Sequence, residues 1–253
     1  MGTVKLARSG ACGTVTGMST TPNPYRGFRF PAEIINQAVW LYHSFSLSLR
    51  DVELILAARG VVVSYETIRE WSLRFGRTYA NSLKRRRPKT GDKWVLDEVF
   101  VRIRGKLHYL WRAVDQHGNV LDALVQNRRN KKAATHFFRK LLKGLCYVPR
   151  VNVTDKLGSY GAAKRETLPS VEHRQNRYLN NRCEVSHQPT PRRERHMRRF
   201  KSVRHAQQFL ATHSLIQNHF QLCRHRLSAS EYRAARDRAF ATWCDVTGAA
   251  LAG

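Results

Sequence analysis

The hydrophobic pattern of the chain changes its period at Pro88, and this change limits the fold more than any other feature. Before Pro88, apolar residues recur every three or four positions, as in an amphipathic helix. After it, apolar and polar residues alternate, and turn residues separate three such runs. These runs predict consecutive strands over 94–103, 106–115 and 120–125. A helix over 130–145, a strand over 150–154 and a helix over 158–167 follow, so we expect an α/β sandwich rather than a bundle or a barrel.

The part before Pro88 predicts three helices joined by short turns. Pro31 suits the first turn of a helix, and Ser48 with Asp51 resembles the capping box of a second one. The second helix is expected to end at Gly60, and Ser64 to cap a third. A helix, a Gly-containing turn and another helix indicate a helix-turn-helix that binds DNA; a plain helical bundle is the alternative. The residues expected to face a major groove are Tyr65, Glu66, Thr67 and Arg69.

The same patterns divide the chain into four parts. Residues 1–24 lack periodicity and predict a disordered leader, in which Met18 is an alternative start. Residues 25–88 are expected to form the helix-turn-helix domain and a basic linker. The α/β domain is expected over 89–227 and a helical tail over 228–253. The cations of the linker are Lys84, Arg85, Arg86 and Arg87.

The net charge indicates a polyanionic partner. The 253 residues include 45 Lys and Arg against 18 Asp and Glu, which gives +27. Nucleic acid is the commonest polyanion; an anionic membrane is the other candidate, but the basic residues are interleaved with core-like segments rather than placed on one amphipathic helix. No apolar run approaches the length of a membrane span, and the five cysteines form no CxxC pair. We therefore expect a reduced cytoplasmic protein with no membrane partner.

Two of the few acids lie in strands that otherwise contain core residues. Asp97 shares its strand face with Val95 and Val99, and Asp155 follows Val151 and Val153 where a strand ends. Burying an unpaired carboxylate costs several kcal/mol, so these acids require a partner. Carboxylates at adjacent strand ends can hold a pair of Mg²⁺ ions, whereas a turn or an ion pair is the alternative, above all for Asp155.

A third acid, Glu184, is expected to share a helix face with His187, three residues on. The basic run that follows suits the grip of a DNA backbone beside a metal centre; a solvated basic face is the alternative. The chain has no GxGxxG sequence and no Walker-type loop, so we expect no nucleotide cofactor. The cations of this run are Arg192, Arg193, Arg195, Arg198, Arg199, Lys201 and Arg204.

Five motifs together resemble the insertion-sequence 6 family of DDE transposases. They are YRGFRFP at 25–31, SLRDVE at 48–53, WVLDEVFV at 94–101, VTDKLGSYG at 153–161 and YLNNRCEVSHQPT at 178–190. The resemblance implies an α/β fold: an RNase H-like catalytic domain, with a mixed sheet flanked by helices, preceded by an all-α helix-turn-helix domain. It also implies that Asp97, Asp155 and Glu184 form the catalytic, metal-binding triad.

The resemblance further implies an insertion-sequence transposase that binds terminal inverted repeats, cleaves the ends of its mobile element and joins the 3′-OH to target DNA. Mg²⁺ would be the cofactor, with Mn²⁺ as a substitute. The partners would be double-stranded DNA and further copies of the chain, as a homodimer or higher oligomer, in the nucleoid-associated part of a bacterial cytoplasm. Two other functions stay open: an inactive, transposase-derived DNA-binding regulator and a basic RNA-binding protein.

Overall fold

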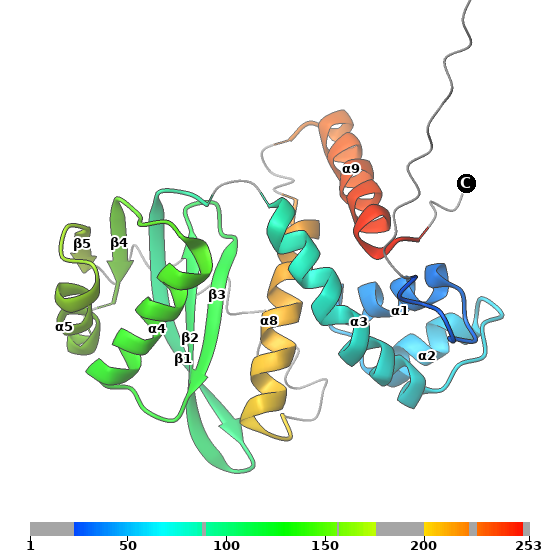
Figure 1. Cartoon of the computed structure of the whole chain (residues 1–253), viewed down its shortest axis with the longest axis horizontal. Helices are drawn as coiled ribbons and strands as arrows, with labels where there is room; N and C mark the ends of the chain where they lie inside the picture. The colour runs from blue at the N-terminus through cyan, green and yellow to red at the C-terminus, as the bar shows by residue number, and fades with distance from the viewer. Residues whose placement is uncertain (1–22, 88–89, 156, 176–199, 223–226, 250–253) are drawn as a thin grey trace, which may run out of the picture.

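The computed structural model describes residues 23–87, 90–155, 157–175, 200–222 and 227–249, and Figure 1 shows its two halves. The first half begins with helices α1 (Ala32–Ser44), α2 (Leu49–Ala57) and α3 (Tyr65–Arg86). The predicted caps are confirmed: Ser48 and Asp51 form a capping box on α2, and the Ser64 hydroxyl accepts a hydrogen bond from Thr67 N at 3.3 Å. Gly60 adopts a positive φ of 77° just after α2, where a side chain would be strained.

The second half contains a five-stranded sheet with the order β3-β2-β1-β4-β5. Strands β1, β2 and β3 form an antiparallel meander, whereas β4 and β5 are parallel to β1. This is a mixed sheet, so the predicted fold class is confirmed. The strands are β1 (Lys93–Ile103), β2 (Lys106–Asp115), β3 (Val120–Gln126), β4 (Val151–Thr154) and β5 (Glu172–Gln175).

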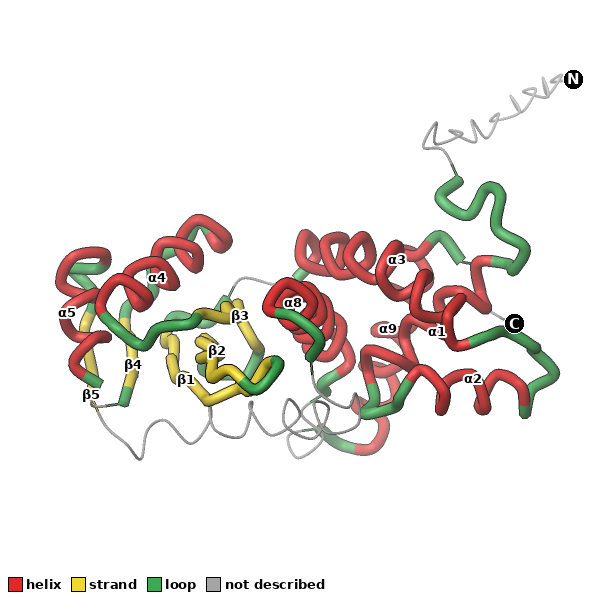
Figure 2. Tube along the Cα trace, turned by 90° about the horizontal axis from the view of Figure 1, so that it is seen from below, coloured by secondary structure: helices red, strands yellow, loops and turns green. Residues whose placement is uncertain are grey.

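Two helices cover one face of this sheet. Helices α4 (Lys131–Leu145) and α5 (Gly158–Thr167) lie together on the same side of the strands (Figure 2). Their aromatic side chains Phe137, Phe138 and Tyr160 pack on Trp94 and Trp111, and all five are buried. Large buried rings account for much of the apolar area that stabilises a core, so this layer fixes the position of β1.

Helix α8 (Val203–Phe220) lies between the sheet and the first three helices, where it covers the free edge of β3 (Figure 2). Its side-chain amides replace the missing neighbouring strand. Gln207 accepts from Val125 N at 2.9 Å and donates to Ala123 O at 2.9 Å, and Asn218 makes the same pair of bonds with Val120 at 3.0 and 2.8 Å. These bonds satisfy backbone groups that an open edge would leave available for aggregation.

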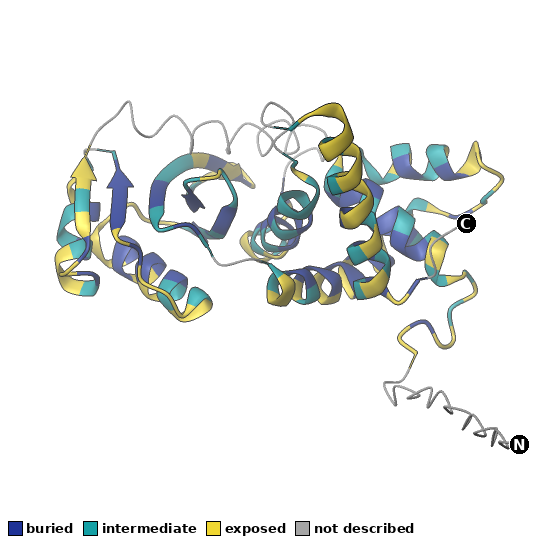
Figure 3. Cartoon of the chain, turned by 90° about the horizontal axis from the view of Figure 1, so that it is seen from above, coloured by how far each residue is buried: buried dark blue, intermediate teal, exposed yellow. Residues whose placement is uncertain are grey.

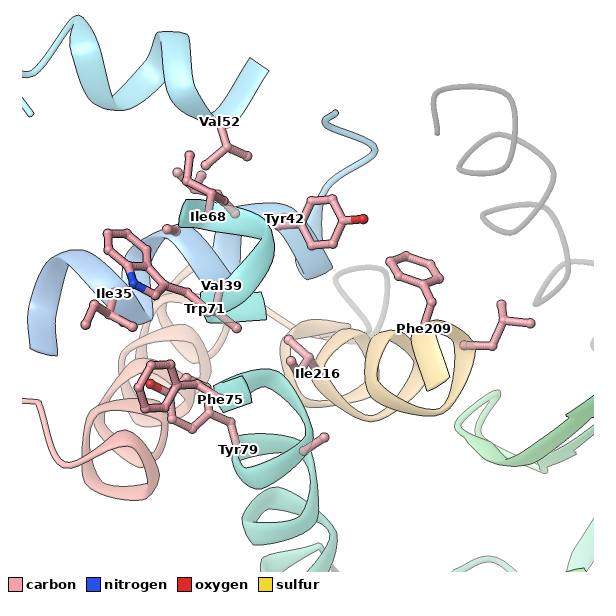
Figure 4. Close-up of a cluster of buried hydrophobic side chains, with 14 of the residues drawn as sticks. Ile35, Val39, Tyr42, Val52, Ile68, Trp71, Phe75, Tyr79, Phe209 and Ile216 are labelled. Atoms are coloured by element: carbon pink, nitrogen blue, oxygen red, sulfur yellow. The ribbon is translucent and has the colours of Figure 1, made fainter. Parts of the chain in front are cut away.

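The last helix, α9 (Ala229–Thr247), packs against the N-terminal helices. This helix lies within the segment expected to form a helical tail, and Thr247 O accepts a hydrogen bond from the Tyr25 hydroxyl, which is also hydrogen-bonded to Tyr79. Burial, the largest cause, raises the pKa of the Tyr79 hydroxyl. Figure 4 shows the shared core, in which Phe75 and Tyr79 of α3 lie near α1 and α8.

The helical half and the sheet are not separate cores. One buried cluster contains Ile68 and Trp71 of α3, Phe209 of α8, and Val101 and Val125 of the sheet. The structure therefore differs from a helical domain that ends at residue 88, because α8 and α9 complete that domain from the other end of the chain. A second difference concerns α3, which continues to Arg86. Three cations of the predicted linker therefore form its last turn, where their positive charge interacts favourably with the negative end of the helix dipole.

Exposed residues follow one side of α3 and much of α9, and buried residues follow the side of α3 that faces its neighbours (Figure 3). Among the helices that the structure describes, none is long and apolar enough to cross a membrane.

Candidate active site

Strand pairing brings Asp97 and Asp155 together. Strands β1 and β4 run parallel, with Val95 opposite Val153. Each aspartate follows its valine by two residues, so the two side chains leave the same face of neighbouring strands at the same level. Oxygen atoms of Asp97, Glu98 and Asp155 all lie within 4.8 Å of one another. The convergence expected for two of these acids is thus present, and a third carboxylate accompanies them.

The carboxylate of Asp155 is fixed at the end of β4. Its Oδ1 accepts a hydrogen bond from Leu157 N at 3.0 Å, which closes a turn into α5. The preceding Thr154 is buried, and its hydroxyl is hydrogen-bonded to His173 Nε2 on β5 at 2.9 Å. The side chain of Asp155 is 28% exposed, so it can reach a ligand without leaving this turn.

Glu98 is the acid that the sequence analysis missed. It follows Trp94 and Leu96 on the other face of β1, and its side chain is only 2% exposed. Its Oε1 accepts from Arg129 Nε at 2.6 Å and lies 2.5 Å from Arg129 Nη2. Burial raises the pKa of the Glu98 carboxyl, while a hydrogen bond to Tyr160 opposes that shift. The period-two reading that selected Asp97 would have found Glu98 if it had been applied to both strand faces.

Arg129 contacts both the buried Glu98 and the partly exposed Asp155. It belongs to the loop between β3 and α4, and its Nη2 also lies 3.6 Å from Asp155 Oδ2. Its guanidinium lies over the Phe100 ring, 5.9 Å from the ring centroid, which is within the limit of about 6 Å for a cation–π contact. Arg129 therefore pairs with both Glu98 and Asp155, and Asp97 and Asp155 are the partly exposed carboxylates of the cluster.

The cluster fits a divalent cation. Carboxylate oxygens are the ligands that Mg²⁺ and Mn²⁺ prefer, and Mg²⁺ binds them at about 2.0–2.1 Å. Oxygens from Asp97 and Asp155 within 4.8 Å of each other can therefore reach one ion, or the two ions of a two-metal site. Both side chains are only partly buried, so a metal and a substrate phosphate have access.

The remaining predicted site residues are distributed over the molecule. Glu184 lies outside the described residues, as do Arg192, Arg193, Arg195, Arg198 and Arg199. Tyr65, Thr67 and Arg69 lie in the first turns of α3, with Tyr65 under the Arg50 guanidinium at 4.5 Å. Lys201 precedes α8.

The three predicted arginines after Lys84 have different surroundings. Arg85 donates to Ser82 Oγ at 3.2 Å, and Arg86 pairs with Asp245 on α9. Arg87 is half-buried, and burial lowers its pKa while the charges of Asp122 and Asp115 oppose that shift. Arg86 and Arg87 thus have intramolecular acidic neighbours, which no sequence pattern indicated.

A mixed sheet whose adjacent parallel strands bring carboxylates together is the arrangement of the DDE class of enzymes, which cleave and transfer DNA strands with divalent metal. A family model described as a DDE domain matches residues 91–222. The transposase for insertion sequence element IS257 in transposon Tn4003 of Staphylococcus aureus is 31% identical over 170 residues, which cover 65% of this chain and 75% of that protein. The transposase for insertion sequence-like element IS431mec of S. aureus strain N315 matches with the same identity and coverage. The chain belongs to the insertion-sequence 6 family of DDE transposases.

Two solved structures show partial structural similarity to the chain. The catalytic domain of Mos1 transposase, solved with raltegravir and Mg, has a TM-score of 0.39 and 15% identity, covering 69% of this chain and 94% of that one. The HTLV-2 integrase catalytic core domain in complex with magnesium, in its trimeric form, has a TM-score of 0.38 and 11% identity, covering 57% and 95%. The family assignment rests on the sequence matches rather than on these scores.

Proposed function

We propose that this transposase binds the terminal inverted repeats of its own mobile element, cleaves the element ends and joins the freed 3′-OH to target DNA. One observation carries the proposal: Asp97 of β1 and Asp155, just after the parallel neighbour β4, converge with oxygens within 4.8 Å of each other. That arrangement suits metal-assisted transfer of a phosphodiester, and the family match supports the same chemistry.

Asp97 and Asp155 would hold the metal, Mg²⁺ or in its place Mn²⁺, with Glu184 as the third ligand that the family resemblance implies. When bound, the metal lowers the pKa of an attacking water or hydroxyl and stabilises the charge on the leaving oxygen. The Leu157 amide keeps Asp155 in one orientation during both steps. Arg129 compensates the buried charge of Glu98, so that β1 can present Asp97 beside it. No Tyr or Ser nucleophile and no covalent protein–DNA intermediate are required.

The rest of the function follows from charge and position. Tyr65, Thr67 and Arg69 on α3 would contact the inverted repeats, while Arg85, Arg86, Arg87 and Lys201 would contact phosphates. The basic residues Arg192, Arg193, Arg195, Arg198 and Arg199 would add a grip without sequence preference. Because two element ends must meet, the active form would be a homodimer or a higher oligomer, acting on double-stranded DNA in the bacterial nucleoid.

Metal removal tests this proposal. The purified chain is incubated with a duplex that carries the DNA flanking its gene, together with a supercoiled target plasmid. With Mg²⁺ or Mn²⁺ we expect nicks at the element ends and covalent joining to the plasmid; with a chelator we expect neither product, because the carboxylates alone supply no Lewis acid. Tight, end-specific binding without any cutting in either metal would instead indicate a non-catalytic regulator.

A further inference from the structure

A large groove runs between the helical half and the sheet half, away from the acid cluster. Its volume is about 1870 Å³, and it is lined by α3, by α8 as far as Leu215, by the start of β3, by the end of α4, and by the end of α1 and the start of α2. Eight of its lining residues are Lys or Arg, and three are acidic. A concave surface with this charge balance concentrates a positive field, so its ligand is expected to be an anion.

Helix α3 forms one wall of this groove with a row of side chains along one of its faces. Tyr65, Arg69, Leu73, Arg77 and Lys84 all line it, and their spacing places them on one face of the helix. The opposite face of α3 holds buried side chains of the core. The stripe from Arg69 to Lys84 is about 22 Å long at 1.5 Å per residue. A single phosphate group would not need cations over that distance.

The opposite wall supplies cations from the catalytic half. Lys201 and Arg204 lie at the start of α8, and Lys143 lies in the last turn of α4. Burial lowers the pKa of His205, and the charges of Lys201 and Arg69 lower it further. One imidazole is thus close to cations of both walls.

The acids of the groove already have partners. Asp51 accepts from Ser48 N at 2.6 Å in the α2 cap, Asp122 pairs with Lys140, and Glu66 is hydrogen-bonded to Tyr65. Within the part of the chain that the structure describes, seven of the eight lining cations form no ion pair with an acid. These are Arg50, Arg69, Arg77, Lys84, Lys143, Lys201 and Arg204.

We infer that this groove binds one sugar-phosphate backbone of double-stranded DNA, so that α3 and the catalytic half hold the same DNA segment. Phosphates on each strand of B-DNA rise by about 3.4 Å per nucleotide along the helix axis, so a 22 Å stripe parallel to that axis spans about six of them. Helix α4 begins two residues after Arg129, which contacts the acid cluster, and ends in the groove. Its 15 residues set a distance of about 22 Å between the groove and the site of cleavage. The inference rests on the proposed function for the identity of the substrate.

Salt-dependent DNA binding tests the inference. A variant with Arg77→Gln, Lys143→Gln and Arg204→Gln loses one cation from each of the three helices. The matched control, Arg165→Gln, Arg233→Gln and Arg238→Gln, loses three exposed cations that do not line the groove. The dissociation constant for a 30-base-pair duplex is measured by fluorescence anisotropy between 50 and 200 mM salt, in chelator. Each lost phosphate contact lowers the slope of log K against log salt by about 0.9.

We expect the slope of the groove variant to fall by about 2 to 3, and that of the control by less than 1. A charge-preserving variant, Arg77→Lys, Lys143→Arg and Arg204→Lys, should keep the wild-type slope, which separates lost charge from misfolding. Equal slopes for the groove variant and the control would overturn the inference. A structured RNA that binds more tightly than the duplex and shows the same loss would also overturn it.

The same assay separates this inference from the proposed function, because binding is measured without metal. Wild-type binding with the expected loss in the groove variant, but no cutting in Mg²⁺, would leave the groove in place and reject the catalytic proposal. Cutting by the wild type, with groove and control variants equal in slope, would do the reverse.

Discussion

Replacing Asp97 with asparagine is expected to slow cleavage at the element ends by about three orders of magnitude, while the chain stays folded. Asparagine keeps the shape of the side chain but removes the negative oxygen that would bind the metal. Losing a metal's stabilisation of the transition state costs several kcal/mol, and about 4 kcal/mol corresponds to a thousandfold in rate. The midpoint of thermal unfolding should stay constant or rise, because the change removes one of three carboxylates within 4.8 Å of one another.

The measurement is a single-turnover cleavage rate on end DNA in Mg²⁺, combined with a thermal melt and a DNA-binding curve. Asp237→Asn is the matched control: it makes the same chemical change on α9, where Asp237 is exposed and, among the described residues, forms an ion pair only with the adjacent Arg236. That control should cleave at the wild-type rate. Cleavage by Asp97→Asn within a factor of ten of wild type would show that this carboxylate is not a metal ligand.

Truncating Trp243 to alanine is expected to destabilise the whole helical half by about 3–5 kcal/mol. Trp243 is 2% exposed, and its ring packs edge-on against Tyr79 at 5.3 Å and Phe220 at 5.8 Å between centroids. Its loss leaves a cavity between α3, α8 and α9, because neighbours on three helices cannot all move inward. The neighbouring Asn36–Thr247 hydrogen bond, 3.1 Å long, should weaken with it.

Chemical denaturation checks this prediction through the free energy of unfolding. Arg233→Ala on the exposed side of the same helix is the control, since alanine keeps the helix propensity and no described acid pairs with Arg233. The control should change stability by less than about 1 kcal/mol. If both variants unfold alike, α9 contributes little to the fold and the N-terminal helices are stable without it.

Local signals predicted most of the fold. The strand predicted over 106–115 matches β2, because alternation and the Arg104-Gly105 turn are both local. The Ser48–Asp51 cap and the helix over 158–167 are local in the same sense. Strand β5 escaped prediction because its sequence, EHRQ, is a largely exposed edge strand without apolar alternation. The return of α9 to α3 depends on packing between the two ends of the chain, which no window of sequence contains.

The residues of the candidate site likewise include some that local sequence could identify and some that only the tertiary structure reveals. Asp97 and Asp155 could be selected because a carboxylate in an apolar strand requires an explanation, and strand pairing supplies their proximity. Glu98 could have been selected by the same reasoning. Arg129 could not, because a loop arginine among 45 cations carries no local mark. The basic groove is also a property of tertiary structure, since its cations come from elements more than 100 residues apart.

The central claim is that Asp97 binds the metal that drives strand cleavage, and a metal-specificity switch tests it most directly. Both ions prefer oxygen ligands, but Mn²⁺ is a softer transition-metal ion that accepts a thiolate ligand more readily than Mg²⁺ does. The Asp97→Cys variant is assayed for end cleavage in each metal beside the wild type. We predict no cleavage by the variant in Mg²⁺ and recovery in Mn²⁺. Cleavage in Mg²⁺ at the wild-type rate would contradict the claim.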